Sequence, residues 1–274
     1  MYWVIQNNLF NEVGYTSLIE VMDRMELKYK VVRVVPFADK IIDINFESED
    51  FTGDINNIPD IEIDTDDNVC VLGATSLIRI SKLKQWFPGA FLNENMNYNV
   101  WKLHWGDNLL NYESHVCEFK DVDKWYDTFF IRPTKDSKSF NGSVYKWEDF
   151  VKWKEDVVNQ SNSKLQLNEN TEVMVSPLKE IYSEVRYFIV DGKIVTASQY
   201  KLGKQVIHST IISESNIEYA QKMIDIWCPD RAFVIDIADT SDGYKIVECN
   251  CINSAGFYDC DVSKIVNAIN DMKF

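Results

Sequence analysis

The sequence predicts an α/β (α+β) protein of 274 residues, and three observations support that prediction. Short β-type runs alternate with amphipathic segments in the first third of the chain, which is typical of βαβ units and a parallel sheet. The last third instead carries paired apolar runs joined by turns that contain Asp-Gly, which is typical of antiparallel hairpins. Hydrophobic residues make up 46% of the chain, which is enough for a substantial core.

The charge and the cysteine pattern exclude some classes of function. The chain carries 28 Lys and Arg against 43 Asp and Glu, a formal net charge of −15, whereas broad nucleic-acid binding needs a positive face. Its six cysteines are scattered, which indicates reduced thiols in a cytoplasmic protein rather than a disulfide framework. There is no signal-peptide pattern and no run approaching the roughly 20 apolar residues of a membrane span, so we expect neither membrane nor general nucleic-acid partners.

An N-terminal α/β domain is predicted over residues 1–100, followed by a connector over residues 101–126. The expected strands of the domain are short apolar runs at Tyr2–Gln6, Lys30–Val35 and Val69–Leu72. Between the first two of these runs, apolar residues recur at helical spacing over Tyr15–Leu27. The connector is rich in aromatic residues and is expected to contain a helix.

Two β-rich subdomains are predicted in the rest of the chain, over residues 127–175 and 176–274. The elements expected in the first are strands at Thr128–Ile131, Ser143–Lys146 and Glu172–Val175 and a helix at Trp147–Asn159. The elements expected in the second are two hairpins, with strands at Ser183–Val190, Lys193–Tyr200, Ala232–Ala238 and Tyr244–Glu248, and two helices, at Ile217–Ile226 and Val262–Met272.

The closing hairpin carries the strongest chemical signal. Glu248 and Asn250 project from the same face of one strand because strand side chains alternate, and Asp236 can face the same side from the neighbouring strand. Carboxylate and amide oxygens are ligands that Mg²⁺ accepts in proteins, with substrate phosphates completing its shell. Unpaired carboxylates in apolar strands are costly, so we predict a metal site here. A solvated hairpin face is the alternative.

Two groups of cations are candidates for binding phosphate. Arg132 ends an apolar strand, and the loop after it supplies Lys138, small hydroxyl residues and a glycine, a composition that suits a phosphate chain. A polar surface turn is the alternative for this group. Glu184 and Arg186 share a strand face, with Lys201 at the end of the paired strand, although such a pair alone is more often an exposed edge. The sequence contains neither a P-loop nor a dinucleotide-binding fingerprint.

The cysteines near the C-terminus admit two interpretations. Cys249, Cys251 and Cys260 lie near Asp259 and suggest zinc, but their spacing lacks a second Cys-x-x-Cys pair. Small buried thiols on a strand are the favoured interpretation. No Cys/His or Ser/His pair has the local spacing of a known catalytic nucleophile and its base.

Taken in this order, the three groups resemble the ATP-grasp family, including poorly characterised ATP-grasp proteins of large bacteriophages. Asp236, Glu248 and Asn250 match the metal-binding set of that family. Phe129–Pro133 matches the strand that opens its lid, with Arg132 where lysine is usual. The resemblance implies an ATP-grasp fold, in which an N-terminal pre-ATP-grasp domain precedes a small β-rich lid subdomain and a β-rich C-terminal subdomain.

The resemblance also implies roles around the nucleotide and the acyl group. Met174 and Val175 would hold the adenine through backbone bonds and apolar contact. The ribose hydroxyls, the phosphate chain and the acyl phosphate would meet, in that order, Glu180 or Glu184, then Arg132, Lys138 and Lys201, then Arg186. The lid segment of this chain departs from the family in having a single glycine where several are common.

We therefore expect an ADP-forming, ATP- and Mg²⁺-dependent carboxylate–amine ligase that acts on small-molecule or peptide substrates. Such an enzyme works by positioning and charge neutralisation and needs no side-chain nucleophile. A phosphotransferase on the same fold and a nucleotide-binding regulatory module without turnover are the alternatives. A metal-free binding protein would require Asp236, Glu248 and Asn250 to diverge in space.

Overall fold

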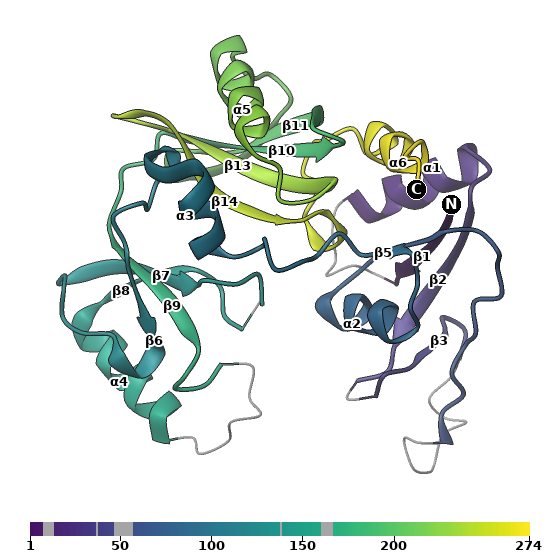
Figure 1. Ribbon diagram of the computed structural model, residues 1–274, viewed down its shortest axis with the longest axis horizontal. Coiled ribbons are helices and arrows are strands. Elements are labelled where there is room, and N and C mark those ends of the chain that lie inside the picture. The colour runs from purple at the N-terminus through teal and green to yellow at the C-terminus, as the bar shows by residue number, and fades with distance from the viewer. Residues whose placement is uncertain (8–13, 37, 47–56, 138, 160–166) are drawn as a thin grey trace.

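The computed structural model describes residues 1–7, 14–36, 38–46, 57–137, 139–159 and 167–274. Within these residues the chain forms three β-sheets with helices packed on them. Figure 1 shows the N-terminal sheet (purple and blue) and the middle sheet (teal) side by side, with the C-terminal sheet (green and yellow) lying across both. The mixed α+β fold predicted from the sequence is confirmed. In the described part of the chain, no helix combines the length and the apolar character needed to cross a membrane.

The N-terminal sheet is mostly parallel, as the alternating pattern predicted. Its strands, in the spatial order β3-β2-β1-β4-β5, are Ile41–Asp43, Lys28–Val34, Tyr2–Gln6, Val69–Leu72 and Pro88–Gly89. Strand β1 pairs in parallel with β2 and β4, β4 pairs in parallel with β5, and β3 is antiparallel to β2. Two amphipathic helices, α1 (Gly14–Arg24) and α2 (Thr75–Leu83), bury their apolar residues against this sheet and its neighbours.

The middle sheet is antiparallel and contains a strand that sequence reasoning missed. Its strands, in the spatial order β6-β9-β7-β8, are His115–Glu118, Glu172–Pro177, Thr128–Pro133 and Ser143–Lys146. Strand β6 comes from the stretch predicted as a connector and makes β9 an interior strand, paired on both sides. Helix α4 (Trp147–Asn159) packs on the sheet through an aromatic core that includes Phe119, Phe129 and Phe150.

The C-terminal sheet consists of two hairpins and an additional edge strand. Its strands, in the spatial order β12-β11-β10-β13-β14, are Gln205–Ser209, Lys193–Leu202, Ser183–Val190, Ala232–Thr240 and Gly243–Cys251. All neighbouring strands are antiparallel. The turn from β10 to β11 places Asp191 at φ 47° and Gly192 at φ 73°, the left-handed conformations that a tight hairpin turn favours.

The two faces of the C-terminal sheet are covered differently, and this positions the candidate site. One face packs against helices α3 (Tyr98–Trp105) and α5 (Glu214–Ile226) through residues such as Tyr187 and Ile235. The other face packs against α6 (Val262–Asn270) and α1 through residues such as Phe188 and Val234. Because alternate residues share a face, the charged side chains of β10, β13 and β14 lie on this second face, beyond the apolar patch that α6 covers.

Asn253 joins the N-terminal sheet to the end of β14. Its side chain donates a hydrogen bond to the carbonyl of Val71 at 2.5 Å and accepts one from the amide of Phe91 at 2.7 Å. Its own carbonyl accepts from the amide of Gly73 at 2.8 Å. The side chain is 1% exposed, so both polar groups of its amide depend on these partners. Asn253 therefore holds two sheets in register.

Replacing Asn253 by alanine is expected to lower the free energy of unfolding by about 2–3 kcal/mol, because the buried amide of Phe91 and carbonyl of Val71 lose their partner. Urea denaturation followed by circular dichroism measures this loss. Asn267, exposed on α6, is the matched control: Asn267→Ala should change stability by no more than about 0.5 kcal/mol. Equal stabilities for the two variants would contradict the assignment.

Candidate functional site

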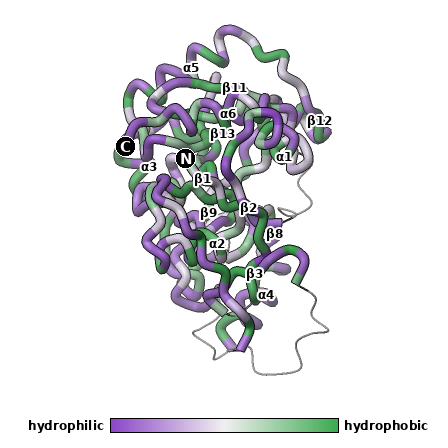
Figure 2. Tube along the Cα trace, turned by 90° about the vertical axis from the view of Figure 1, so that its right-hand side faces the viewer, coloured by the Kyte–Doolittle hydropathy of each residue, from purple (hydrophilic) through white to green (hydrophobic). Residues whose placement is uncertain are grey.

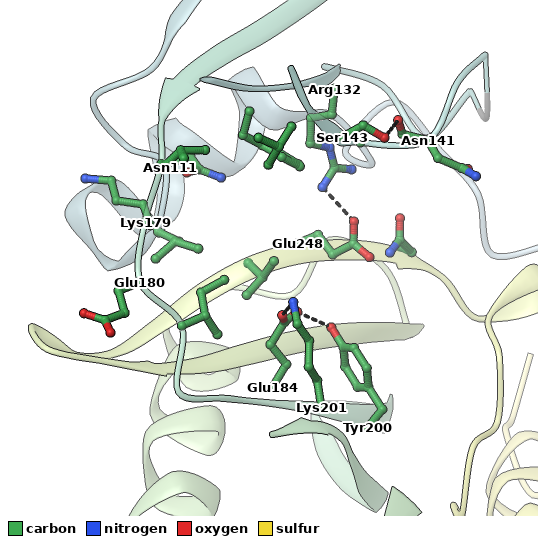
Figure 3. A pocket seen from close by; sticks show the side chains of 18 of the residues that line it. Asn111, Arg132, Asn141, Ser143, Lys179, Glu180, Glu184, Tyr200, Lys201 and Glu248 are labelled. Carbon is green, nitrogen blue, oxygen red and sulfur yellow. Dashed lines mark hydrogen bonds and ion pairs between the residues drawn. The ribbon is translucent and has the colours of Figure 1, made fainter. Parts of the chain in front are cut away.

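A large cavity lies between the middle sheet and the C-terminal sheet (Figure 3). Its volume is about 1240 Å³. The residues that line it come from the β7–β8 region, from the segment that joins β9 to β10, and from the C-terminal sheet: Arg132, Phe140, Gly142, Ser143 and Val144; Pro177 to Tyr182; and Glu184, Tyr200, Lys201, Glu248 and Asn250. Both β-rich parts of the chain therefore build one site.

Arg132 and Glu248 form an ion pair across the cavity. The Nη1 atom of Arg132, on β7, lies 2.7 Å from Oε2 of Glu248, on β14. The Arg132 guanidinium also lies 5.4 Å from the ring centre of Trp101, which leaves its side chain only 10% exposed. The Glu248 side chain is 28% exposed and faces the cavity. Figure 3 shows this pair as a bridge from the middle sheet down to the C-terminal sheet.

Arg186 and Asp236 form a buried pair just behind Glu248. They lie directly opposite one another on β10 and β13, and Asp236 is in turn opposite Glu248 on β14. Nε and Nη2 of Arg186 donate to the two oxygens of Asp236 at 2.9 and 2.8 Å, and Nη2 lies 3.6 Å from Glu248. Burial alone would lower the pKa of Arg186, but the charges of the two carboxylates raise it well above its usual value. Burial raises the pKa of Asp236 to about 6, with Arg186 acting in the opposite direction.

Lys201, Glu184 and Tyr200 form the third charged group. The Lys201 ammonium makes a close ion pair with Glu184, and the Tyr200 hydroxyl lies 2.6 Å from Glu184 and 3.2 Å from Asp236. A β-bulge between Glu184 and Val185 turns both Tyr200 and Lys201 toward the same face of the sheet. Burial and the two nearby carboxylates raise the pKa of Tyr200 well above its usual value, so the phenol keeps its proton.

The structure thus brings most of the sequence-predicted charged residues together. Each of three carboxylates is paired with a cation: Glu248 with Arg132, Asp236 with Arg186, and Glu184 with Lys201. Asn250 lies one strand step beyond Glu248 on the same face and also lines the cavity. Asp236, Glu248 and Asn250 therefore do not diverge in space, which removes the basis for a metal-free binding protein. The predicted phosphate-binding Lys138 lies outside the described residues.

Met174 and Val175 do not occupy the position expected of adenine-binding residues. Both lie inside β9, where Met174 pairs with Arg132 on one side and Val116 on the other. Both side chains are 1% exposed and pack into apolar cores rather than lining the cavity. The expectation failed because β6 was missed, and without β6 one edge of β9 would have been open. The segment that lines the cavity begins where the β9 ladder ends, at Pro177.

Sequence reasoning also missed Tyr200 and most of the segment from Pro177 to Tyr182, called the hinge segment below. Tyr200 stands next to Lys201 in a predicted strand, and regular alternation would have placed the two side chains on opposite faces. The bulge that brings them together leaves no clear signal in the sequence. Glu180 was predicted and does lie in the hinge segment, exposed, with its side chain directed away from Glu248 in Figure 3.

The C-terminal cysteines are buried thiols. Cys249, Cys251 and Cys260 are at most 6% exposed and belong to three different apolar cores. Among the described residues, no three Cys, His, Asp or Glu side chains gather in a way that would hold a metal ion by themselves. A metal ion in the cavity would therefore depend on the Asn250 amide and on oxygens supplied by a ligand.

A family model described as an ATP-grasp domain, clade family 3, matches residues 54–269 of the chain. The match covers the lining of the cavity and both of its sheets. The chain belongs to the ATP-grasp family. No curated protein sequence matches it.

Solved structures of ATP-grasp proteins share the fold of the whole chain at low sequence identity. The D-alanine–D-alanine ligase from Bacillus anthracis complexed with ATP has a TM-score of 0.57 at 12% identity, over 98% of this chain and 92% of that one. The ATP-grasp ligase PsnB complexed with a minimal precursor has a TM-score of 0.54 at 12% identity, over 98% and 97%. A RimK domain ATP-grasp protein from Sphaerobacter thermophilus has a TM-score of 0.58 at 10% identity, over 98% and 100%. These likenesses establish the ATP-grasp fold.

Proposed function

We propose that this ATP-grasp protein is an ATP- and Mg²⁺-dependent ligase that activates a substrate carboxylate as an acyl phosphate for attack by an amine or similar nucleophile. The observation that supports this most is the set of three cation–carboxylate pairs around one cavity. Such a set offers cations to a phosphate chain and oxygen ligands to a metal ion, within a few ångströms of each other. It supplies positioning and charge neutralisation, the two contributions that acyl phosphate formation requires.

The hinge segment is the proposed place of the nucleoside. Leu178 and Ile181 line the cavity there and offer apolar contact to a base. Glu180, exposed in the same segment, is the better candidate to accept the ribose hydroxyls, because the carboxylate of Glu184 already binds Lys201 and Tyr200. The adenine contact first expected of Met174 and Val175 is thus reassigned to the residues that follow Pro177.

The proposed metal ligands fit Mg²⁺. Glu248 and Asn250 present oxygens to the cavity, and Asp236 lies directly across from Glu248. A carboxylate has about four lone-pair sites, so Asp236 can keep its two bonds from Arg186 and still offer an oxygen. Mg²⁺ commonly takes one or two protein carboxylates and completes its shell with phosphates and water. Bound there, it would neutralise charge that develops on the phosphates.

The chemical step moves one phosphoryl group and then one acyl group. A carboxylate oxygen of the substrate attacks the γ-phosphorus of ATP, the bond to the β-phosphate oxygen breaks, and ADP leaves. An amine then attacks the acyl carbon, phosphate leaves with the attacking carboxylate oxygen, and the amine loses a proton. Arg132, Lys201 and Lys138 are proposed to hold the phosphate chain. Arg186 is proposed to stabilise the acyl phosphate from its position behind Glu248.

Binding of Mg²⁺ and ATP is expected to be strongly cooperative. ATP alone would draw Arg132 and Lys201 away from Glu248 and Glu184, and Mg²⁺ alone would compete with Arg132 for Glu248. Either ligand alone leaves charges unpaired in a partly buried site, whereas both together exchange every partner. Isothermal titration should show ATP binding at least about tenfold more weakly in EDTA than with Mg²⁺. Independent binding of the two would contradict the exchange of partners.

The proposed function is tested by screening amino acids, short peptides and acidic metabolites, with and without amines, for ADP release. Mass spectrometry of the products should show a carboxylate joined to an amine with loss of water. ADP release with a phosphorylated hydroxyl product would select a phosphotransferase instead. Nucleotide binding without turnover across the screen would select a regulatory module.

A further inference from the structure

The outermost strand of the C-terminal sheet, β12, is unusually apolar for an exposed edge. Val206 is 78% exposed on this strand, and Ile211, just beyond it, is 85% exposed. Strand β12 pairs with β11 and ends the sheet, so the other edge of its backbone is open to a further strand. Figure 2 shows β12 at the right-hand margin of the molecule. Proteins normally protect such edges, and an exposed one with apolar side chains is the kind of surface that takes an added strand.

The cavity side of β12 is continuous with the candidate site. Val206 lies opposite Lys201, so the two side chains share the face of the sheet that carries the ion pairs. His208, two residues on, is on that face too, and its ring lies 5.4 Å from the ring of Tyr258. Leu202, Gly203 and Lys204, in the turn before β12, line the cavity itself.

Tyr258 connects this edge to the buried arginine. Its ring stacks on Tyr200 at 4.8 Å, and the Arg186 guanidinium lies 5.0 Å from its centre. The residue has φ 51°, a left-handed conformation that is uncommon for a residue other than glycine and that recurs at ligand-binding sites. A continuous surface of Val206, His208 and Tyr258, called the β12 strip below, therefore leads from the sheet edge to Arg186.

The charge around the β12 strip differs from that of the whole protein. The net charge is −15, yet no Asp or Glu occurs between Gly192 and Ser213, a stretch that contains three lysines. Lys204 is exposed at the cavity mouth and forms no ion pair with any residue that the structure describes. An extended chain that carries carboxylates complements both the open edge and this local charge.

We propose that the β12 strip docks an extended acidic peptide, which adds a strand to β12 and presents a carboxylate to the cavity. This inference rests on the proposed function for the fate of that carboxylate, and it narrows the substrate class to a peptide. Backbone bonds to β12 provide affinity, Val206 and His208 contact alternate side chains, and Lys204 attracts the acidic ones.

The probe is a short, end-blocked, fluorescently labelled peptide of alternating valine and glutamate, and binding is followed by fluorescence anisotropy. Val206→Asp should weaken binding about tenfold, because it places like charge beside the peptide. Leu103→Asp is the matched control: Leu103 is 84% exposed, but on α3, so the same change of charge occurs away from β12. The control should bind as the wild type does. Hydrogen exchange should show protection of residues 205–209 by the peptide.

Three outcomes would overturn the docking proposal: equal binding of a valine–lysine peptide, undiminished binding of a peptide N-methylated at alternate amides, or equal loss in both variants. Absence of binding would overturn it as well. ATP affinity is measured separately on the same protein. Nucleotide binding without peptide binding removes the docking proposal and leaves the proposed function, whereas peptide binding without nucleotide binding does the reverse.

Discussion

Glu248→Gln should reduce ADP formation by about a thousandfold or more while the protein stays folded. Glu248 is the exposed carboxylate of the candidate metal set and also the partner of Arg132, so the substitution removes a negative charge where Mg²⁺ and the phosphates would meet. Glutamine keeps the shape of the side chain and an oxygen that accepts from Arg132. The thermal midpoint should therefore move little. Steady-state ADP release and a thermal scan of the same preparation measure both effects.

Glu218→Gln is the matched control for this variant. Glu218 is exposed on α5, on the face of the sheet opposite the ion pairs, and the chemical change is identical. The control should retain wild-type turnover. Wild-type turnover in Glu248→Gln would remove Glu248 from the site.

Arg186→Met should destabilise the protein by about 3–5 kcal/mol and also abolish turnover. The loss of stability follows because Asp236 is 1% exposed and would keep a buried charge without its bidentate partner. The double variant Arg186→Met/Asp236→Leu removes both charges and should recover most of the stability without recovering activity. Urea denaturation and ADP release separate the two effects.

The pair of Arg231 and Asp191 provides the control for burial. It has the same bidentate geometry, at 2.7 and 2.8 Å, but its side chains are 41% and 46% exposed. Arg231→Met should cost no more than about 1 kcal/mol, because an exposed pair loses little when it is broken. Equal costs at the two sites would show that burial does not determine the contribution of Arg186. Recovery of turnover in the double variant would show that the pair serves stability alone.

The fold could be predicted where the chain repeats a local pattern. Strands β1 and β4 are short apolar runs, and the Asp191–Gly192 turn carries the residues that a tight hairpin demands. Strand β6 could not be recognised, because its four residues are mostly exposed and it exists only through pairing with β9. Such pairing is a tertiary property that composition does not reveal.

The candidate site could be predicted in its charged residues but not in their partners. Asp236 and Glu248 stand out because carboxylates are costly in apolar strands, and alternation places Asn250 beside Glu248. That Arg186 would bind Asp236 depends on the register between β10 and β13, which no local pattern fixes. The sequence likewise could not show that the cavity wall is the hinge segment rather than β9.

The central claim is that ATP activates a carboxylate as an acyl phosphate, and an oxygen-18 transfer experiment tests it most directly. The carboxylate substrate identified by the screen is labelled with oxygen-18 in both oxygens and turned over with ATP, Mg²⁺ and the amine. Because the oxygen that attacks the γ-phosphorus leaves with the phosphate, the account predicts one labelled oxygen in each phosphate released. Phosphate without label, formed alongside ADP, would contradict it.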